Sequence, residues 1–417
     1  MTANAADLPG YKDRRLLGAL TAVTGWILWA YLRLRPQGVL LRHPQLLPHY
    51  DQWAYSRLAY SDIIALYHNH HLYLHLLPYI QNRIEYPVLM GLMMWMASFA
   101  PGVAGYFAFN ALVVWLASLG SVLLLRRLVP RVYHWFAWTP LLLVYSLLNW
   151  DLIGIFLLIG GWYLYRQGRY RWAAAVFALG VFFKLFPIFL LPCILAELWR
   201  QRDFGTMRRM VGIFFLVSLA INLPFALSNF KYWSYFYVYN AGRGLGADIW
   251  ANLWVHGVPV RVADMLSLLV VGVTALWQML RVFKGVSAVS GAAMLFAVFL
   301  FVNKVFSPQY MIWMMAYAVL AEWPVGAYAV LALGGIVDYL NSFSVLFLLS
   351  THSTAGRWYA QHLFPLGLLV RYSSLVAAAV WAKWPGLTWD PDAPSANAGL
   401  RTGPVTSGEI SGRSLKG

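Results

Sequence analysis

Long apolar stretches separated by short polar segments occupy most of the chain between residues 16 and 382. A helix needs about 20 apolar residues to cross the roughly 30 Å hydrocarbon core of a bilayer, and several stretches reach that length. We therefore predict an all-α polytopic membrane protein with about twelve transmembrane helices. The predicted spans lie near 16–34, 103–125, 134–148, 151–165, 172–184, 187–199, 210–227, 259–280, 287–303, 310–322, 325–347 and 363–382. Some are short enough to be broken or half-buried, which membranes tolerate where backbone lines a cavity.

Clusters of basic residues predict the orientation of this bundle. Cytoplasmic loops carry an excess of Lys and Arg. A cytoplasmic N-terminus places every cluster on the cytoplasmic side: Arg126, Arg127 and Arg131; Arg166, Arg169 and Arg171; Arg200, Arg202, Arg208 and Arg209; Arg281 and Lys284; and Lys383. The first apolar run follows basic residues and has no small-residue cleavage site after it, so we expect an uncleaved signal anchor. Both termini are then cytoplasmic.

Two long segments fall on the external side in this arrangement. The first external loop, 35–102, includes an apolar stretch at 86–100 that we interpret as an interfacial or re-entrant helix with Pro87 in its first turn. The second external loop, 228–258, is rich in aromatic residues, which form either an interfacial belt or a rim that stacks on sugar or lipid. Residues 1–383 are expected to form a single membrane domain, and the Gly-, Pro-, Ser- and Ala-rich segment 384–417 a disordered cytoplasmic tail.

Composition excludes a water-soluble globular protein. Hydrophobic residues make up 61% of the 417 residues, and charged residues make up 11%, against about 25% in soluble domains. The net charge of +16 has no separate basic domain to carry it, so we expect anionic membrane lipids and lipid phosphates as partners, and no nucleic acid. Cys193 is the only cysteine, so no intrachain disulfide forms.

Acidic residues on the external side are the first candidates for chemistry. Asp62 lies in an apolar segment, where partial desolvation would raise its pKa and suit it to act as a general base; the alternative is a helix-capping or salt-bridged Asp. Glu85 precedes the 86–100 helix and either caps it electrostatically or orients an acceptor. Asn149, Trp150 and Asp151 fall at an external turn and form either a plain polar turn or a set that grips sugar hydroxyls.

Cations at the ends of apolar runs are the second group of candidates. Lys184 and Lys304 both lie on the predicted external face near a proline, where they either snorkel to the head groups or bind a lipid phosphate. Arg371 falls within the last predicted span, and Asp338 is a conceivable partner unless that span begins later. The histidines at 68, 70, 71 and 75 have loose spacing for zinc, so we expect a solvated segment and no metal or other cofactor.

The order of these short motifs resembles that of the GT-C superfamily, in particular glycosyltransferase family 87. The block Tyr60-Ser61-Asp62, with Tyr67, Pro78-Tyr79 and Glu85-Tyr86-Pro87 after it, is similar to the family's first external loop. Asn149-Trp150-Asp151, Lys184-x-Phe186-Pro187 and the segment from Lys304 to Tyr310 are similar to later family blocks. The resemblance covers roughly residues 16–320 and implies a GT-C-like bundle.

The resemblance also implies a function. It points to transfer of a sugar, commonly mannose in bacteria, from a polyprenyl-phosphate-sugar to a glycolipid or glycan acceptor at the outer face of the plasma membrane. The family's catalytic Asp falls on Asp62, with Asp51 as an earlier carboxylate in the same loop, and its phosphate-contacting positions fall on Lys184 and Lys304. We add as candidate substrate-binding residues Tyr67, Glu85, Asn149, Asp151, Arg243, His256 and Gln309. The main alternative is a transporter or flippase of lipid-linked sugars, which predicts matching halves that the sequence does not show.

Overall fold

Helices make up 79% of the computed structural model. The structure describes residues 9–36, 50–252 and 258–383, and no strand occurs within these ranges. In hydrocarbon the backbone N–H and C=O groups have no water to bond, so helices satisfy them internally. The protein is therefore an all-helical membrane protein, as the apolar runs predict.

Six segments of the described chain are long and apolar enough to cross a membrane. Each contains at least 21 residues. They correspond, one by one, to the predicted spans near 16–34, 103–125, 210–227, 259–280, 325–347 and 363–382. They are α1 (Pro9–Leu34), α6 (Gly102–Leu128), α12 (Phe204–Ser228), α16 (Val260–Phe283), α19 (Val325–Ser350) and the pair α20 (Thr354–His362) and α21 (Phe364–Lys383). The multi-pass character follows from these segments alone.

Shorter helices account for the other predicted spans. They are α9 (Asp151–Arg166), α10 (Tyr170–Phe183), α11 (Leu191–Arg200), α17 (Ala288–Val302) and α18 (Tyr310–Leu320). The 3₁₀ turn η4 (Phe186–Leu190) precedes α11. Their length falls below that of a full span, so the number of about twelve transmembrane helices stays a prediction.

The predicted span at 134–148 is not one helix. It consists of α7 (Tyr133–Trp138) and α8 (Leu141–Tyr145), which are separated at Thr139 and Pro140. Proline disfavours helical geometry in the residue before it, and Thr139 has extended backbone with ψ of 129°. The segment then turns at 146–150 and leads directly into α9.

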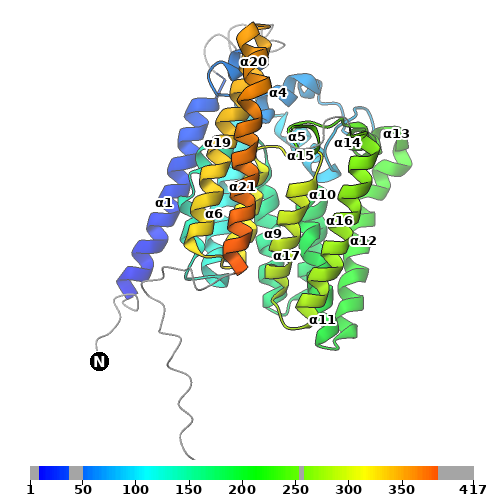
Figure 1. Ribbon diagram of the computed structural model, residues 1–417. Helices are drawn as coiled ribbons and strands as arrows, with labels where there is room; N and C mark the ends of the chain where they lie inside the picture. The colour runs from blue at the N-terminus through cyan, green and yellow to red at the C-terminus, as the bar shows by residue number, and fades with distance from the viewer. Residues whose placement is uncertain (1–8, 37–49, 253–257, 384–417) are drawn as a thin grey trace, which may run out of the picture.

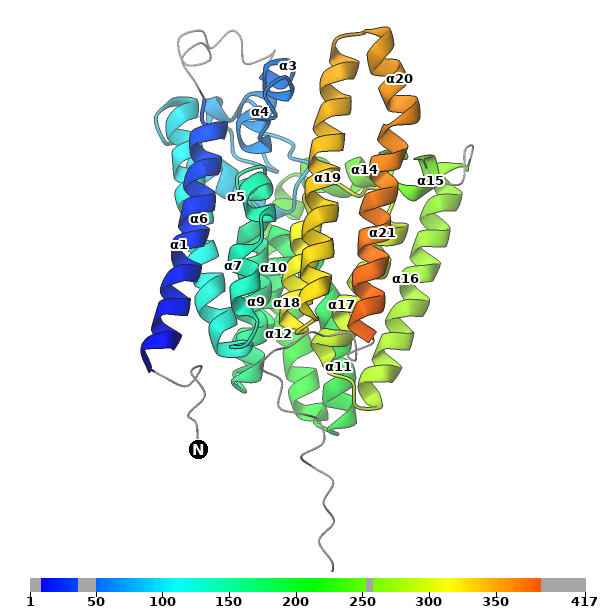
Figure 2. The same cartoon turned by 60° about the vertical axis from the view of Figure 1, so that its left-hand side comes forward.

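Both long loops lie at the same end of the bundle (Figures 1 and 2). The first contains α3 (Tyr50–Tyr55), α4 (Asp62–Asn69), η3 (Leu72–Leu74) and α5 (Val88–Ala97), and the second contains α13 (Phe230–Trp233), α14 (Tyr235–Gly242) and α15 (Ile249–Asn252). The first residue of α1 and the last of α21 lie at the opposite end. The two loops thus share one side, as the sequence predicts, while the side of the membrane that they face stays a prediction.

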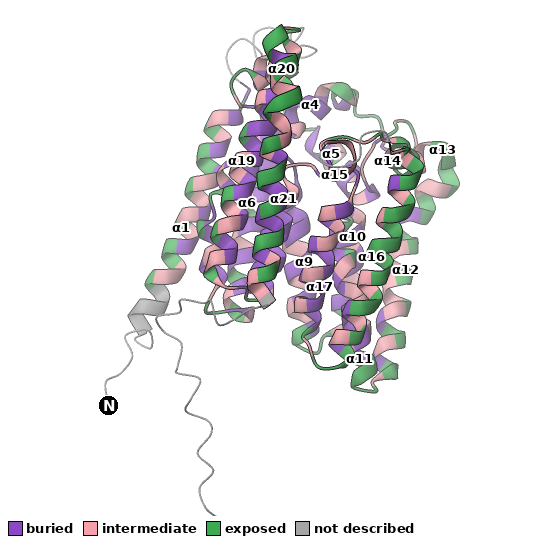
Figure 3. Cartoon of the chain, in the orientation of Figure 1, coloured by how far each residue is buried: buried purple, intermediate pink, exposed green. Residues whose placement is uncertain are grey.

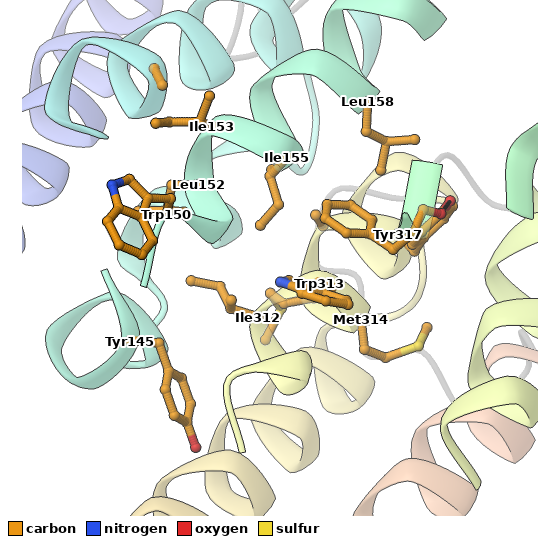
Figure 4. Packing of buried hydrophobic residues seen from close by; sticks show 14 of the residues in the cluster. Tyr145, Trp150, Leu152, Ile153, Ile155, Leu158, Ile312, Trp313, Met314 and Tyr317 are labelled. Carbon is orange, nitrogen blue, oxygen red and sulfur yellow. Dashed lines mark hydrogen bonds between the residues drawn. The ribbon is translucent and has the colours of Figure 1, made fainter. Parts of the chain in front are cut away.

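The most buried part of the bundle is formed by α18 and α9. Every residue of α18 from Met311 to Leu320 is buried, whereas few residues of the outer helices α12 and α16 are buried (Figure 3). Trp313 and Tyr317 of α18 lie near Leu152, Ile155 and Leu158 of α9 (Figure 4). A helix that is apolar all round is buried on all sides. This packing fixes the N-terminal end of α9, where the candidate site is found.

Candidate active site

Asp62 opens α4 and is held against the turn that precedes α9. Its backbone N–H donates to the carbonyl of Leu148 at 2.8 Å, and the buried Ser61 hydroxyl donates to the carbonyl of Leu147 at 2.6 Å. Ser61 N–H also donates to the Tyr50 hydroxyl at 3.0 Å. These bonds place the carboxylate of Asp62, a half-buried residue, beside the side chain of Asn149.

Asn149 uses both ends of its amide. Its Nδ2 donates to Asp62 Oδ2 at 2.7 Å and to the Tyr86 hydroxyl at 3.2 Å. Its Oδ1 accepts from the Trp150 backbone N–H at 2.6 Å and from Lys184 Nζ at 2.9 Å. An amide has two N–H donors and an oxygen with two lone pairs, so every position is filled and the orientation of the group is fixed.

Lys184 connects this amide to a second carboxylate. Its Nζ lies 3.0 Å from Asp151 Oδ1, and both side chains are buried. Nζ also lies over the ring of Tyr86, 4.9 Å from the centroid, and 5.9 Å from that of Trp313. Each charge of this buried pair offsets the cost of burying the other, because a single buried charge without a partner is strongly destabilising. Asp62, Asn149, Lys184 and Asp151 therefore form one continuous polar chain.

The end of α10 explains how Lys184 reaches this position. Pro187 has no N–H to continue a helix, and Lys184 leaves α10 with extended backbone at φ of −148° and ψ of 126°. The neighbouring helix allows a close approach at Gly154, where a Cβ would lie 3.0 Å from both Lys184 Cβ and a ring carbon of Phe186. The Lys-Leu-Phe-Pro sequence thus aims an ammonium group at the start of α9.

Burial raises the pKa of Asp62 to about 6. Hydrogen bonds from Tyr60 and Asn149 and the charge of Lys184 lower it, which limits the rise, and the charge of Asp151 adds to it. Burial also raises the pKa of Tyr60 and Tyr86 well above that of an ordinary tyrosine, so both hydroxyls stay protonated near neutral pH. A carboxylate that titrates just below neutrality, with neutral donors around it, is suited to accept a proton.

Two other candidates of the first loop have their own partners. Glu85 Oε2 lies 2.6 Å from His70 Nε2. Tyr67 is buried, and its ring packs on that of Tyr106 with centroids 4.8 Å apart. The structure gives neither residue a direct contact with the polar chain that contains Asp62.

The indole of Trp150 is not available to a sugar. It is fully buried, and its Nε1 donates to Asn110 Oδ1 at 2.6 Å. Of the three-residue motif at 149–151, the amide and the carboxylate therefore enter the polar chain, while the indole anchors the turn to α6.

The remaining candidates lie around the second loop. Lys304 Nζ is 2.9 Å from Asp264 Oδ2 and donates to the carbonyl of Ala241 at 3.1 Å, so it belongs to a pair separate from that of Lys184. Gln309 precedes α18 and is half-buried. Arg243 is half-buried, with its guanidinium 5.8 Å from the ring centroid of Tyr239. His256 lies outside the described residues.

Tyr310 links Arg243 to the polar chain. Its hydroxyl interacts electrostatically with Arg243, Asp151 and Asp62. Its ring stacks on Trp313 with centroids 4.0 Å apart. The sequence alone assigns no catalytic or binding role to Tyr60, Tyr86, Tyr310 or Trp313, although the first three stand in the motifs that resemble the family blocks.

A second buried ion pair confirms the predicted partner of Arg371. Its Nη1 lies 3.2 Å from Asp338 Oδ2, and neither side chain is exposed. Arg371 also donates to the carbonyl of Phe306 at 2.9 Å and to that of Ala247. The pair joins α21 and α19 to the two segments that carry Lys304 and Arg243. It thereby holds these two segments against the helices at the loop end of the bundle.

Comparison with known proteins adds no relative: no protein-family model matches the chain, and no curated protein matches it. Within the described residues, no group of three His, Cys, Asp or Glu side chains is arranged to hold a metal ion. The class that the structure itself defines is a multi-pass helical membrane protein with an acid–amide–lysine–acid chain at its loop end.

Proposed function

We propose that this protein is a membrane glycosyltransferase that uses a polyprenyl-phosphate-sugar, most simply the mannose derivative, to glycosylate a glycolipid or glycan at the outer face. The observation that carries the proposal is the placement of Asp62, a half-buried residue whose carboxyl has a pKa of about 6, in hydrogen-bonded series with Asn149 and Lys184. The resemblance of the motifs to glycosyltransferase family 87 supports the same reaction. The GT-C-like bundle is part of this proposal.

The reaction that we propose is a single displacement with inversion. Asp62 removes the proton from an acceptor hydroxyl, and that oxygen forms a bond to the anomeric carbon. The bond between the anomeric carbon and the phosphate oxygen breaks through an oxocarbenium-like state, and polyprenyl phosphate leaves with the electron pair. A phosphate is a good leaving group and needs no general acid, so one base and nearby cations suffice.

The cations have different parts in this scheme. Asp151 already neutralises Lys184, and Asp264 neutralises Lys304. Arg243 forms no ion pair with any other described residue, so we assign it the first contact with the donor phosphate. Lys184 stabilises the charge that develops on that phosphate from its fixed position behind Tyr86.

The test is release of polyprenyl phosphate by the purified protein. Polyprenyl-phosphate-mannose and a membrane acceptor extract should yield polyprenyl phosphate and a mannosylated acceptor, and omission of the extract should reduce the release. A transporter of lipid-linked sugars would instead move the intact donor across the bilayer of proteoliposomes. Movement of intact donor with no release for any acceptor fraction would reject the transferase proposal.

A further inference from the structure

The glycines beside Arg243 give its segment little packing against the bundle. Arg243 follows α14 and stands among three exposed glycines, at 242, 244 and 246. A Cβ added at any of the three would meet no atom of the described residues within 4 Å, and none of the three has a positive φ. Glycine has the largest backbone freedom of all residues. The position of Arg243 therefore depends on what holds the two ends of the segment.

Lys304 holds the first end, two residues before Arg243. Its Nζ donates to the carbonyl of Ala241 at 3.1 Å and lies 2.9 Å from Asp264 Oδ2. The lysine side chain is 10% exposed, whereas that of Asp264 is 41% exposed. An ammonium group can donate three hydrogen bonds, so one group binds the carboxylate and the backbone together. The carboxylate thereby fixes the cation that holds the chain next to Arg243.

Arg371 holds the second end, four residues after Arg243. It donates to the carbonyl of Ala247, while its Nη1 lies 3.2 Å from the buried carboxylate of Asp338. A guanidinium has five N–H donors in a fixed planar fork, so one arginine can bind a carboxylate and a backbone carbonyl at the same time. The ion pair between α21 and α19 thus ends on the backbone of the Arg243 segment.

The two anchors meet on the chain that leaves α17. Val302 is the last residue of α17, and its carbonyl accepts from Trp250 Nε1 at 2.7 Å. Lys304 lies two residues further on, and Phe306 another two. The carbonyl of Phe306 accepts from Arg371 Nη1 at 2.9 Å. Alternate residues of this stretch therefore bind either the second external loop or its other anchor, so the two anchors belong to one structure.

We propose that Lys304 and Arg371 are positioning residues, which fix the two ends of the 241–247 segment and thereby hold Arg243 where it meets the donor phosphate. The inference rests on the proposed function, which gives Arg243 that contact. It departs from the family resemblance, which implies that Lys304 contacts the phosphate itself. Arg371 lies outside the part of the chain that the resemblance covers.

A double-mutant cycle with a binding readout tests the proposal. The first change is Arg243→Gln. The second is Lys304→Met together with Asp264→Leu, which removes the anchor at Ala241, keeps the net charge and leaves neither charge of the pair alone. The dissociation constant of polyprenyl phosphate, without sugar, is measured for the wild type, each variant and their combination in full-length protein in nanodiscs. No turnover is needed for this measurement.

The anchor variant should act only through Arg243. We expect it to weaken the binding of polyprenyl phosphate roughly tenfold when Arg243 is present, and less than about twofold in the Arg243→Gln background. Similar losses in both backgrounds would show that Lys304 contacts the phosphate or supports the site in general. No loss in either would show that the segment needs no anchor at Lys304. Each of these two outcomes overturns the proposal.

Arg371→Lys tests the other anchor and carries the test alone if the Lys304 variant does not fold. Lysine keeps the charge opposite Asp338, but a single ammonium lacks the fork that reaches Asp338 and the carbonyl of Ala247 together. Binding should weaken roughly fivefold, again only when Arg243 is present. A loss that is the same without Arg243, or no loss at all, would remove Arg371 from the positioning role.

Lys231→Met is the matched control for Arg243→Gln. Lys231 is an exposed cation in α13 of the same loop, so its removal changes the charge equally and should alter the affinity less than about twofold. A loss equal to that of Arg243→Gln would show that the loop attracts phosphate by its overall charge. Such a result would overturn the proposal, because no single residue would then need to be positioned.

The two proposals fail in distinguishable ways. Coupling between the anchors and Arg243 in phosphate binding, with no release of polyprenyl phosphate from its mannose derivative for any acceptor, would remove the transferase and leave the positioning role. Release of polyprenyl phosphate without that coupling would remove the positioning role and leave the transferase.

Discussion

At the scale of single residues, the central feature is a carboxylate whose proton affinity is set by its neighbours. Burial raises the pKa of Asp62, while Tyr60 and Asn149 donate to its ionised form. A base whose pKa lies near the working pH combines a useful ionised fraction with a strong pull on the proton. The hydrogen bonds therefore limit the rise in pKa that burial causes, and the residue is mostly ionised at neutral pH.

The first prediction is a pH dependence of transfer. A proposed base must be ionised, so the rate should be level above pH 7 and fall as the pH is lowered through about 6, where Asp62 becomes protonated. Well below that pH, the rate should drop about tenfold for each pH unit, as expected for one titrating group. Initial rates between pH 4.5 and 8.5 measure this profile, and an unchanged rate at pH 4.5 would contradict the assignment.

The second prediction concerns Asn149. Asn149→Asp replaces the donor 2.7 Å from Asp62 Oδ2 with a second carboxylate, which should raise the pKa of Asp62 because like charges disfavour ionisation. The acidic limb of the rate profile should then move upward, with activity recovered at alkaline pH. Asn149→Leu removes the donor without adding charge and should shift the limb less. Equal shifts in the two variants would show that the amide acts only through packing.

At the scale of elements, buried ion pairs join helices that are distant in the sequence. Arg371 and Asp338 connect α21 to α19, and Arg371 also reaches the carbonyls of Phe306 and Ala247. A buried pair gains little over a well-packed apolar pair, but a single buried charge without its partner is costly. The two residues should therefore behave as one unit toward substitution.

The third prediction follows for stability. Arg371→Met leaves Asp338 uncompensated and should lower the free energy of unfolding by about 3–5 kcal/mol. The double variant Arg371→Met with Asp338→Leu should recover part of that loss, since no isolated charge remains. Denaturation in mixed detergent measures the wild type, the single variants Arg371→Met and Asp338→Leu, and the double variant. A double variant whose loss equals the sum of the two single losses would show that the pair is not coupled.

The sequence predicts the helices better than it predicts their contacts. Apolar runs predict the long helices because hydrocarbon forces the backbone to satisfy its own hydrogen bonds. Pro140 interrupts a run that hydropathy alone reads as one span. The partners of Lys184 lie 35 and 33 positions away along the chain, and Asp62 lies 87 positions from Asn149, so no local pattern could pair them.

The pair of Arg371 and Asp338, in contrast, could be predicted, because the membrane leaves few acidic residues as possible partners of Arg371. An intramembrane charge needs a partner, and few acidic residues lie at that depth. Lys304 shows the converse: the apolar run explains its place at the end of α17, but nothing in the spacing indicated that Asp264 of α16 would neutralise it.

At the scale of the whole molecule, the two long loops lie at one end of the bundle and the connections rich in arginine lie at the other. The loops that carry Asp62 and Arg243 lie together in Figures 1 and 2, opposite the start of α1. Near that start, Arg15 contacts His134 at 3.4 Å and Arg127 donates to the Tyr163 hydroxyl at 3.1 Å, which brings the basic connections of α6 and α9 to the same end. The positive-inside rule then predicts that the loop end faces outward.

The fourth prediction tests this orientation in intact cells. Cys193 is buried, so Cys193→Ala gives a background without thiols in which Gln52→Cys in α3 and Gln201→Cys after α11 are each the only cysteine. Both glutamines are exposed, and they lie at opposite ends of the bundle. A membrane-impermeant maleimide should label position 52 in whole cells and position 201 only after lysis. The reverse order would place the proposed site in the cytoplasm.

Comparison of two carboxylates of the first loop tests the central claim most directly. Asp62 lies in the polar chain, whereas Asp51 lies on the exposed side of α3. Polyprenyl phosphate release by purified Asp62→Asn should fall by about 10²–10⁴-fold, the usual contribution of a general base, while the matched variant Asp51→Asn keeps the wild-type rate. Loss of release in Asp51→Asn with full activity in Asp62→Asn would show that another carboxylate removes the proton.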